Sequence, residues 1–135
     1  MLIHEVGILI ESIPVICRKY TKREDPVGIT SKSALISSLI NFAENLISPL
    51  EYFESNNYNI IFKKKKGNNE LEADFFIYIV TKKIKNFEKK WKKKMMILLE
   101  DILNKFYSKY NIKDYYEVSI FSDFNKIIDN LINNL

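Results

Sequence analysis

Hydrophobic residues alternate with polar ones, or run without interruption, in several short segments of the first 81 residues. Residues 6–10 and 13–20 are rich in aliphatic and β-branched side chains and are separated only by Glu11 and Ser12, so they predict an opening hairpin. Further strands are predicted at residues 50–54, 57–65 and 73–81. The stretch FFIYIV in the last of these has no polar face, which is typical of a central strand covered on both sides.

Apolar residues at helical spacing predict three helices. The first runs from about residue 31 to residue 48 and ends before Pro49. A long amphipathic helix is predicted at residues 84–110, and a final helix, capped at Ser122, follows a short extended piece at residues 117–121. The order strand, strand, helix, strand, strand, strand, helix, helix predicts an α+β fold and one domain over residues 1–135.

The helix predicted at residues 31–48 has more apolar surface than contact with one sheet requires. A second stripe of Ile36, Ile40 and Ile47 widens its apolar arc to roughly 160°, against the roughly 100° of an ordinary amphipathic helix. The surplus stripe predicts a contact with a partner chain. The alternative is that the loop at residues 21–30 of the same chain covers it.

Charge is distributed unevenly along the chain, whose net charge is +4. Residues 63–94 contain 12 of the 21 basic residues and 4 of the 17 acidic ones, so this window carries +8 and the remainder −4. We interpret Lys63, Lys64, Lys65 and Lys66 as an exposed hairpin tip, and Lys89, Lys92 and Lys93 as a solvated helix face. Together these seven lysines are the candidate basic surface. A second interpretation is a surface that meets acidic lipid or an acidic protein.

Residues that could carry catalysis or hold a cofactor are sparse in the sequence. His4 is the single histidine and Cys17 the single cysteine, and both lie in predicted strands. The three glycines, Gly7, Gly28 and Gly67, cannot form a phosphate-binding loop. We therefore expect a protein that is not an enzyme and uses neither a metal nor a cofactor. The apolar N-terminus is interrupted by charged residues, so the expected location is the cytoplasm, with peripheral membrane contact as an option.

The order of elements resembles that of the longin domain and the related roadblock domain. The segments that carry the resemblance are VGILIESIPVICRKY, REDPVGITSKS, ALISSLINFAENLI, LEYFESNNYNIIFKKKK, FFIYIVT and KNFEKKWKKKMMILLEDIL, which together span most of the 135 residues. The resemblance implies a five-stranded antiparallel sheet with helices on both faces, a three-layer architecture that profilin-like proteins share.

The resemblance also implies a function. Longin-like and roadblock-like proteins are generally non-enzymatic modules of complexes that bind or regulate small Ras-like GTPases in membrane traffic. Many of them pair through the helix after the second strand and the neighbouring edge strand. Here that interface would comprise Ile36, Ile40 and Ile47 with Tyr52 and Phe53, and the partner would be a second copy or another longin or roadblock chain.

Two other functions fit the sequence. A nucleic-acid-binding protein would use the lysines at 63–66 and 89–94, although the sequence lacks a known nucleic-acid motif, which makes this partner the weaker candidate. A small-ligand sensor of profilin-like or PAS-like shape would need an internal apolar pocket.

Overall fold

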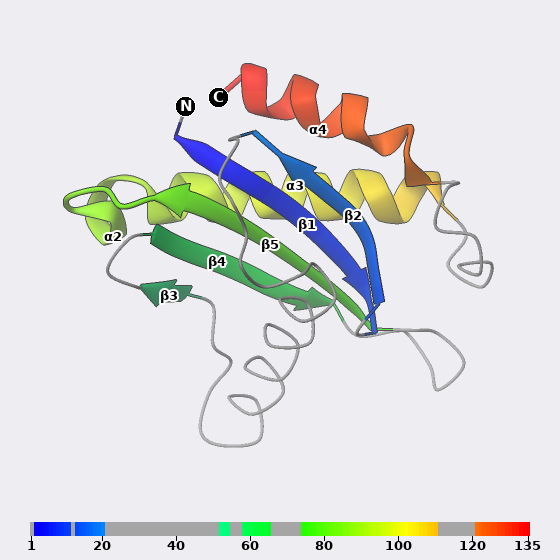
Figure 1. Ribbon diagram of the computed structural model, residues 1–135, viewed down its shortest axis with the longest axis horizontal. Coiled ribbons are helices and arrows are strands. Elements are labelled where there is room, and N and C mark those ends of the chain that lie inside the picture. The colour runs from blue at the N-terminus through cyan, green and yellow to red at the C-terminus, as the bar shows by residue number, and fades with distance from the viewer. Residues whose placement is uncertain (1, 12, 21–51, 55–57, 66–73, 111–120) are drawn as a thin grey trace.

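A computed structural model describes residues 2–11, 13–20, 52–54, 58–65, 74–110 and 121–135. Its centre is an antiparallel sheet, and helix α3 (Lys92–Lys109) crosses behind it (Figure 1). Helix α4 (Phe124–Asn133) lies beside α3, along the border strand β2 (Ile13–Lys19) (Figure 1). The predicted α+β class is therefore confirmed.

The strands form close to where the hydrophobic pattern predicts them. They are β1 (Ile3–Ile10), β2 (Ile13–Lys19), β3 (Tyr52–Glu54), β4 (Tyr58–Lys65) and β5 (Phe75–Lys82). The predicted central strand is confirmed, because β5 pairs with β1 on one side and β4 on the other and is buried from Phe75 to Thr81. The opening hairpin is confirmed as well, and its turn residue Glu11 has a left-handed φ of 56°.

The predicted fold is wrong in the number of full strands in its sheet, whose strand order is β2-β1-β5-β4-β3. Four strands of seven or eight residues build the sheet, while the fifth element is reduced to the three-residue β3 at the border. A border strand has one neighbour, so fewer ladder hydrogen bonds hold it. The described helices α2, α3 and α4 all pack into one core on one face. The predicted five-stranded sheet is thereby corrected to four full strands and the short β3. The first predicted helix, at residues 31–48, lies outside the described residues.

The long predicted helix is divided into α2 (Phe87–Lys90) and α3 (Lys92–Lys109). Trp91 separates them with a φ of −116°, yet its N–H still bonds to the carbonyl oxygen of Phe87 and its own carbonyl accepts from Met95. The chain therefore bends without losing its backbone hydrogen bonds. The final helix, α4 (Phe124–Asn133), begins after Asp123 without a side-chain cap, so the predicted cap at Ser122 is wrong.

Two apolar clusters occupy opposite faces of the sheet, because neighbouring residues of a strand point to opposite sides. Phe75, Ile77 and Ile79 of β5 belong to the larger cluster, which includes the buried residues of all three described helices. Phe76, Tyr78 and Val80 belong to the smaller cluster on the other face, together with Leu9 and Phe62. In that second face the buried Tyr78 hydroxyl donates a hydrogen bond of 2.6 Å to the Glu5 carboxylate. Burial, and then the nearby Glu5, raise the pKa of Tyr78.

One polar contact attaches α4 to the sheet. The Arg18 guanidinium on β2 donates through Nε and Nη2 to the two carboxylate oxygens of Asp129, at 3.0 and 2.9 Å, and the Tyr20 hydroxyl donates to the same carboxylate. The hydrogen bond from Arg18 lowers the pKa of Asp129. Burial, followed by the hydrogen bond to Asp129, raises the pKa of Tyr20. This cluster joins residues more than 100 positions apart in the sequence.

Asp129→Asn is expected to lower the free energy of unfolding by about 1 kcal/mol at neutral pH, a value kept small because Arg18 and Asp129 are 41% and 28% exposed. Since the folded-state pKa of Asp129 lies below the ordinary value of 3.8, the ion pair stabilises the fold above that pH. Its contribution disappears as the pH falls below 3.8 and through the folded-state pKa. The difference between wild type and variant, measured by urea unfolding, should therefore be constant from pH 7 to 5 and shrink under acid.

The matched control for this measurement is Asp101→Asn, which removes an exposed aspartate on α3. It should leave the free energy of unfolding within about 0.5 kcal/mol of wild type. An equal loss in both variants, or an Asp129→Asn effect that grows under acid, would contradict the assigned role.

Candidate functional site

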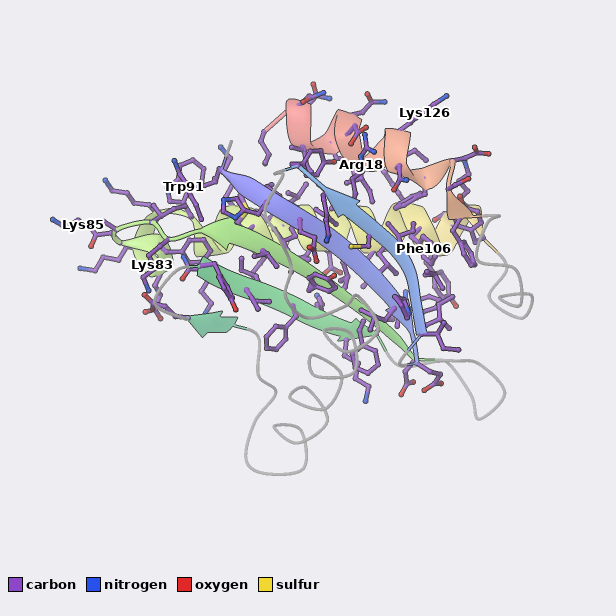
Figure 2. All side chains as sticks on the ribbon, in the orientation of Figure 1. Arg18, Lys83, Lys85, Trp91, Phe106 and Lys126 are labelled. Atoms are coloured by element: carbon purple, nitrogen blue, oxygen red, sulfur yellow. The ribbon has the colours of Figure 1, made fainter. Side chains whose placement is uncertain are left out.

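The lysines of residues 82–94 gather at the end of the molecule where β5 leads into α2 and α3. Figure 2 shows Lys83 and Lys85 extending outward there, far from Lys126 on α4. We call this part of the molecule, residues 82–94, the basic end. Its eight lysines are Lys82, Lys83, Lys85, Lys89, Lys90, Lys92, Lys93 and Lys94. All are exposed except the half-buried Lys92. Glu88 is the one acidic residue in this segment, which therefore carries +7, while the rest of the chain carries −3.

The predicted lysine tip at the other end of β4 is more enclosed than the sequence suggested. Lys63 forms an ion pair with Glu100 on α3. The Lys64 side chain is only 11% exposed, lies over the Phe76 ring and forms an ion pair with Asp74. The Lys65 amine is 3.9 Å from the centre of the Tyr107 ring. These three lysines contact side chains of α3 and β5, so they are not a solvated tip; Lys66 lies outside the described residues.

The two lysine groups do not merge into one continuous surface. In the register of β4 with β5, Lys65 lies opposite Phe75, whereas Tyr58 lies opposite Lys82. These two pairs are separated by seven residue steps along each strand, which corresponds to roughly 23 Å. Of the predicted basic surface, Lys89, Lys92 and Lys93 belong to the basic end, and Lys63, Lys64 and Lys65 belong to the opposite end of the sheet.

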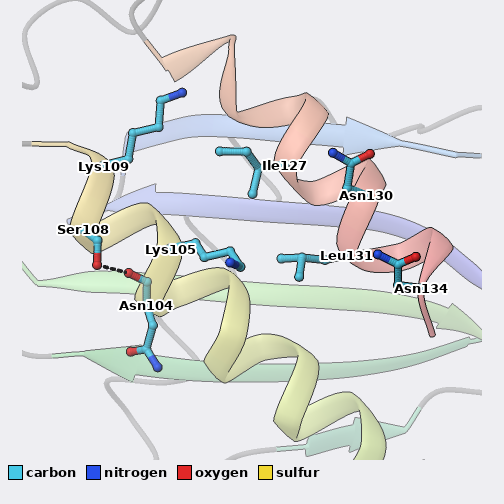
Figure 3. A pocket seen from close by; sticks show the side chains of 8 residues that line it. All are labelled: Asn104, Lys105, Ser108, Lys109, Ile127, Asn130, Leu131 and Asn134. Atoms are coloured by element: carbon cyan, nitrogen blue, oxygen red, sulfur yellow. Dashed lines mark hydrogen bonds between the residues drawn. The ribbon is translucent and has the colours of Figure 1, made fainter.

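A surface groove of about 700 Å³ lies between α3 and α4. Lys105, Ile127 and Leu131 point into the space between the two helices, and Ser108 donates to the backbone carbonyl of Asn104 at its border (Figure 3). The remaining lining residues are Lys109, Asn130 and Asn134. Two lysines, three asparagines and a serine line the groove beside the half-buried Ile127 and Leu131, and the lining has no carboxylate, so it is positively charged. In the sequence, only the apolar stripe of α4 indicated a surface at this place. The distance between α3 and α4 depends on tertiary packing, which the sequence pattern does not give.

The predicted dimer interface falls largely outside the described residues. Ile36, Ile40 and Ile47 are not described, and for Tyr52 and Phe53 the structure describes the backbone of β3 but not the side chains. The backbone of β3 pairs with β4 through Tyr52 with Ile61, Phe53 with Ile60 and Glu54 with Asn59. It occupies the border position of the sheet.

His4 and Cys17, the two residues that could take part in catalysis or metal binding, lie in the first hairpin. His4 is half-buried in β1, and its carbonyl oxygen accepts a hydrogen bond from the Tyr20 N–H. Cys17 is half-buried in β2, opposite Gly7 of β1. Within the described ranges, no group of three or more histidine, cysteine, aspartate or glutamate residues is placed to hold a metal ion.

Comparison with known proteins adds no assignment. No family model matches the chain, and no curated protein sequence matches it. None of the helices in the described part of the chain is both long enough and apolar enough to cross a bilayer.

Proposed function

We propose that the protein is a non-enzymatic interaction module that dimerises, with itself or a related chain, and serves as an adaptor in complexes that bind or regulate small Ras-like GTPases. The resemblance of its sequence to longin and roadblock chains supports this proposal. The single structural observation behind it is the border position of β3, the strand that directly follows the predicted interface helix.

The two borders of the sheet differ in how well they could accept another strand. At the β2 border, Pro14 lacks a donor N–H, Arg18 and Lys19 add charge, and Arg18 attaches α4 through Asp129. Prolines and charged side chains are common means of preventing strand addition. At the β3 border, the described pairing is with β4 alone. Pairing between subunits is therefore favoured at β3.

Three residues of β3 can supply only a few hydrogen bonds to a second subunit. Most of the free energy of association must therefore come from apolar contact, and the surplus stripe of Ile36, Ile40 and Ile47 is the candidate source. A charge placed in that stripe should break the dimer, because an unpaired carboxylate cannot be buried at low cost.

Ile40→Asp is expected to convert a dimer into a folded monomer. The measurement is the molar mass from light scattering after size-exclusion chromatography, with circular dichroism to verify that the variant is folded. The matched control is Ile13→Asp, which places the same charge on the opposite border of the sheet, where Ile13 is 47% exposed. The control should remain dimeric.

A wild type that is already monomeric at high concentration would refute the dimer proposal. Dissociation by Ile13→Asp but not by Ile40→Asp would instead assign the interface to the β2 border. The adaptor role is tested separately by affinity purification from the native cell and mass spectrometry. Recovery of small GTPases or another longin chain supports the role, and recovery of ribosomal or nucleoid material contradicts it.

A further inference from the structure

The apolar residues between and just after the lysines of the basic end pack into the core, so these lysines lie on the outside. Phe87 and Met95 are buried in the main core, and Ile84 and Trp91 are half-buried against it. The backbone hydrogen bonds from Trp91 to Phe87 and from Met95 to Trp91 connect the two helices across the bend. The lysines of this segment are therefore presented by a folded scaffold. They lie on β5, α2, α3 and the connection from β5 to α2, where Figure 2 shows Lys83 and Lys85.

The local charge of the basic end is strong. It carries +7 within 13 residues. Lys83 forms an ion pair with Glu54, and Lys94 lies over the Trp91 ring. Lys85, Lys89, Lys90 and Lys93 are exposed. A charge of +7 within so short a segment attracts an anionic partner.

The chemistry of the basic end favours an anionic lipid surface over a nucleic acid. Nucleic-acid recognition uses arginine forks and aromatic rings that stack on bases. The segment contains no arginine, Phe87 is buried, and Trp91 is packed against the core. Attraction to acidic lipid headgroups requires only point charges near the bilayer, which lysines provide.

An exposed apolar side chain lies next to these lysines. Ile97 of α3 is 55% exposed, and it follows Lys93 and Lys94 by one helical turn, so the three residues share a face. Basic residues flanking an exposed apolar side chain are typical of segments that rest on a bilayer, with the apolar group entering the interface.

We propose that the basic end is a docking surface for a bilayer that contains anionic lipid, with Ile97 entering the headgroup region. The interaction is peripheral and reversible, because it depends on charge and one apolar side chain. It does not depend on the dimer proposed above, since neither the eight lysines nor Ile97 belongs to the proposed interface of Ile36, Ile40, Ile47, Tyr52 and Phe53.

The test compares the full-length wild type with a fourfold variant, Lys85→Gln, Lys89→Gln, Lys90→Gln and Lys93→Gln. Binding to vesicles of phosphatidylcholine with about one third phosphatidylserine is measured by sedimentation at low salt. The variant is expected to lose at least about tenfold in apparent affinity, because each lysine near an anionic surface contributes severalfold. Wild-type binding should also weaken as salt is raised.

A control variant removes the same charge elsewhere: Lys19→Gln, Lys105→Gln, Lys109→Gln and Lys126→Gln, all exposed in the wild type. It should bind the vesicles within about twofold of wild type. Ile97→Asn tests insertion without a change of charge and should weaken binding severalfold. Trp91, the single tryptophan, serves as a fluorescent reporter at the basic end, and its emission should change with the anionic vesicles only.

Three results would overturn the proposal. They are no binding of wild type to anionic vesicles, equal binding to vesicles of phosphatidylcholine alone, and equal losses in the two fourfold variants. Tighter binding to a single-stranded oligonucleotide than to the anionic vesicles at the same salt would also overturn it, in favour of a nucleic-acid partner. A monomeric protein that still binds vesicles would refute only the dimer.

Discussion

Replacement of Phe106 with alanine is expected to lower the free energy of unfolding by about 4 kcal/mol. Phe106 is fully buried on α3 and lies at the centre of an aromatic cluster. Its ring is 5.8 Å from that of Phe75 on β5 and 5.2 Å from that of Phe124 on α4, with nearly perpendicular planes in both pairs. It also contacts Tyr110 and Phe121. Truncation of Phe106 would therefore weaken the packing of the sheet, α3 and α4 against one another.

The magnitude follows from the size of the cavity and from the lost ring contacts. Large apolar residues in a close-packed core typically cost 3 to 5 kcal/mol when cut to alanine, and edge-to-face pairs add about 1 kcal/mol beyond area. Urea unfolding followed by circular dichroism measures the loss. Phe106→Leu should lose about half as much, because leucine fills part of the space.

The control on the same helix is Ile97→Ala, whose side chain is mostly exposed. This variant should remain within about 0.5 kcal/mol of wild type. A Phe106→Ala effect below 1 kcal/mol would show that the aromatic cluster does not join the three elements.

Gly7→Ala is expected to destabilise the protein by about 3 kcal/mol, although alanine normally stabilises a strand relative to glycine by less than 1 kcal/mol. Gly7 lies in the interior strand β1, opposite Tyr78 of β5. A Cβ atom at this position would overlap the outer atoms of the Tyr78 ring. Tyr78 is buried and its hydroxyl is hydrogen-bonded to Glu5, so the ring cannot move aside without losing that bond. The steric cost should therefore exceed the gain from strand propensity.

A double-mutant cycle isolates this clash. In the Tyr78→Leu background, where the outer ring atoms are absent, Gly7→Ala should cost less than 1 kcal/mol. An equal loss of free energy of unfolding in both backgrounds would mean that Gly7 is required by the backbone conformation and not by the Tyr78 ring. Thermal unfolding of the four proteins supplies the comparison.

Much of the local structure could be predicted because it depends on the period of the side chains. The aliphatic and β-branched residues of 13–20 and the apolar run FFIYIV predicted β2 and β5. The three-to-four spacing of Met95, Leu98, Ile102 and Phe106 predicted α3. These patterns depend on neighbours within one helical turn or one strand. Boundaries were less accurate: α4 begins after Asp123, and α3 is separated from α2 at Trp91.

The candidate surfaces were predicted less completely, because a run of like charges does not reveal its contacts. Lys63 and Lys89 looked alike in the sequence. In the structure, Lys63 pairs with Glu100, which is 37 residues away, whereas Lys89 remains exposed. The groove between α3 and α4 depends on the distance between two helices, for which the sequence contains no direct signal.

The sequence by itself determined where the described strands and helices form, apart from their ends and the break at Trp91, and it placed eight lysines within residues 82–94. Only the tertiary structure decided that the described helices share one face, that Arg18 meets Asp129 and that Gly7 accommodates Tyr78. The physical reason is distance along the sequence. Periodicity and propensity depend on neighbouring residues, whereas Gly7 and Tyr78 are 71 positions apart and Arg18 and Asp129 are 111 positions apart. Such residues meet only when the core packs.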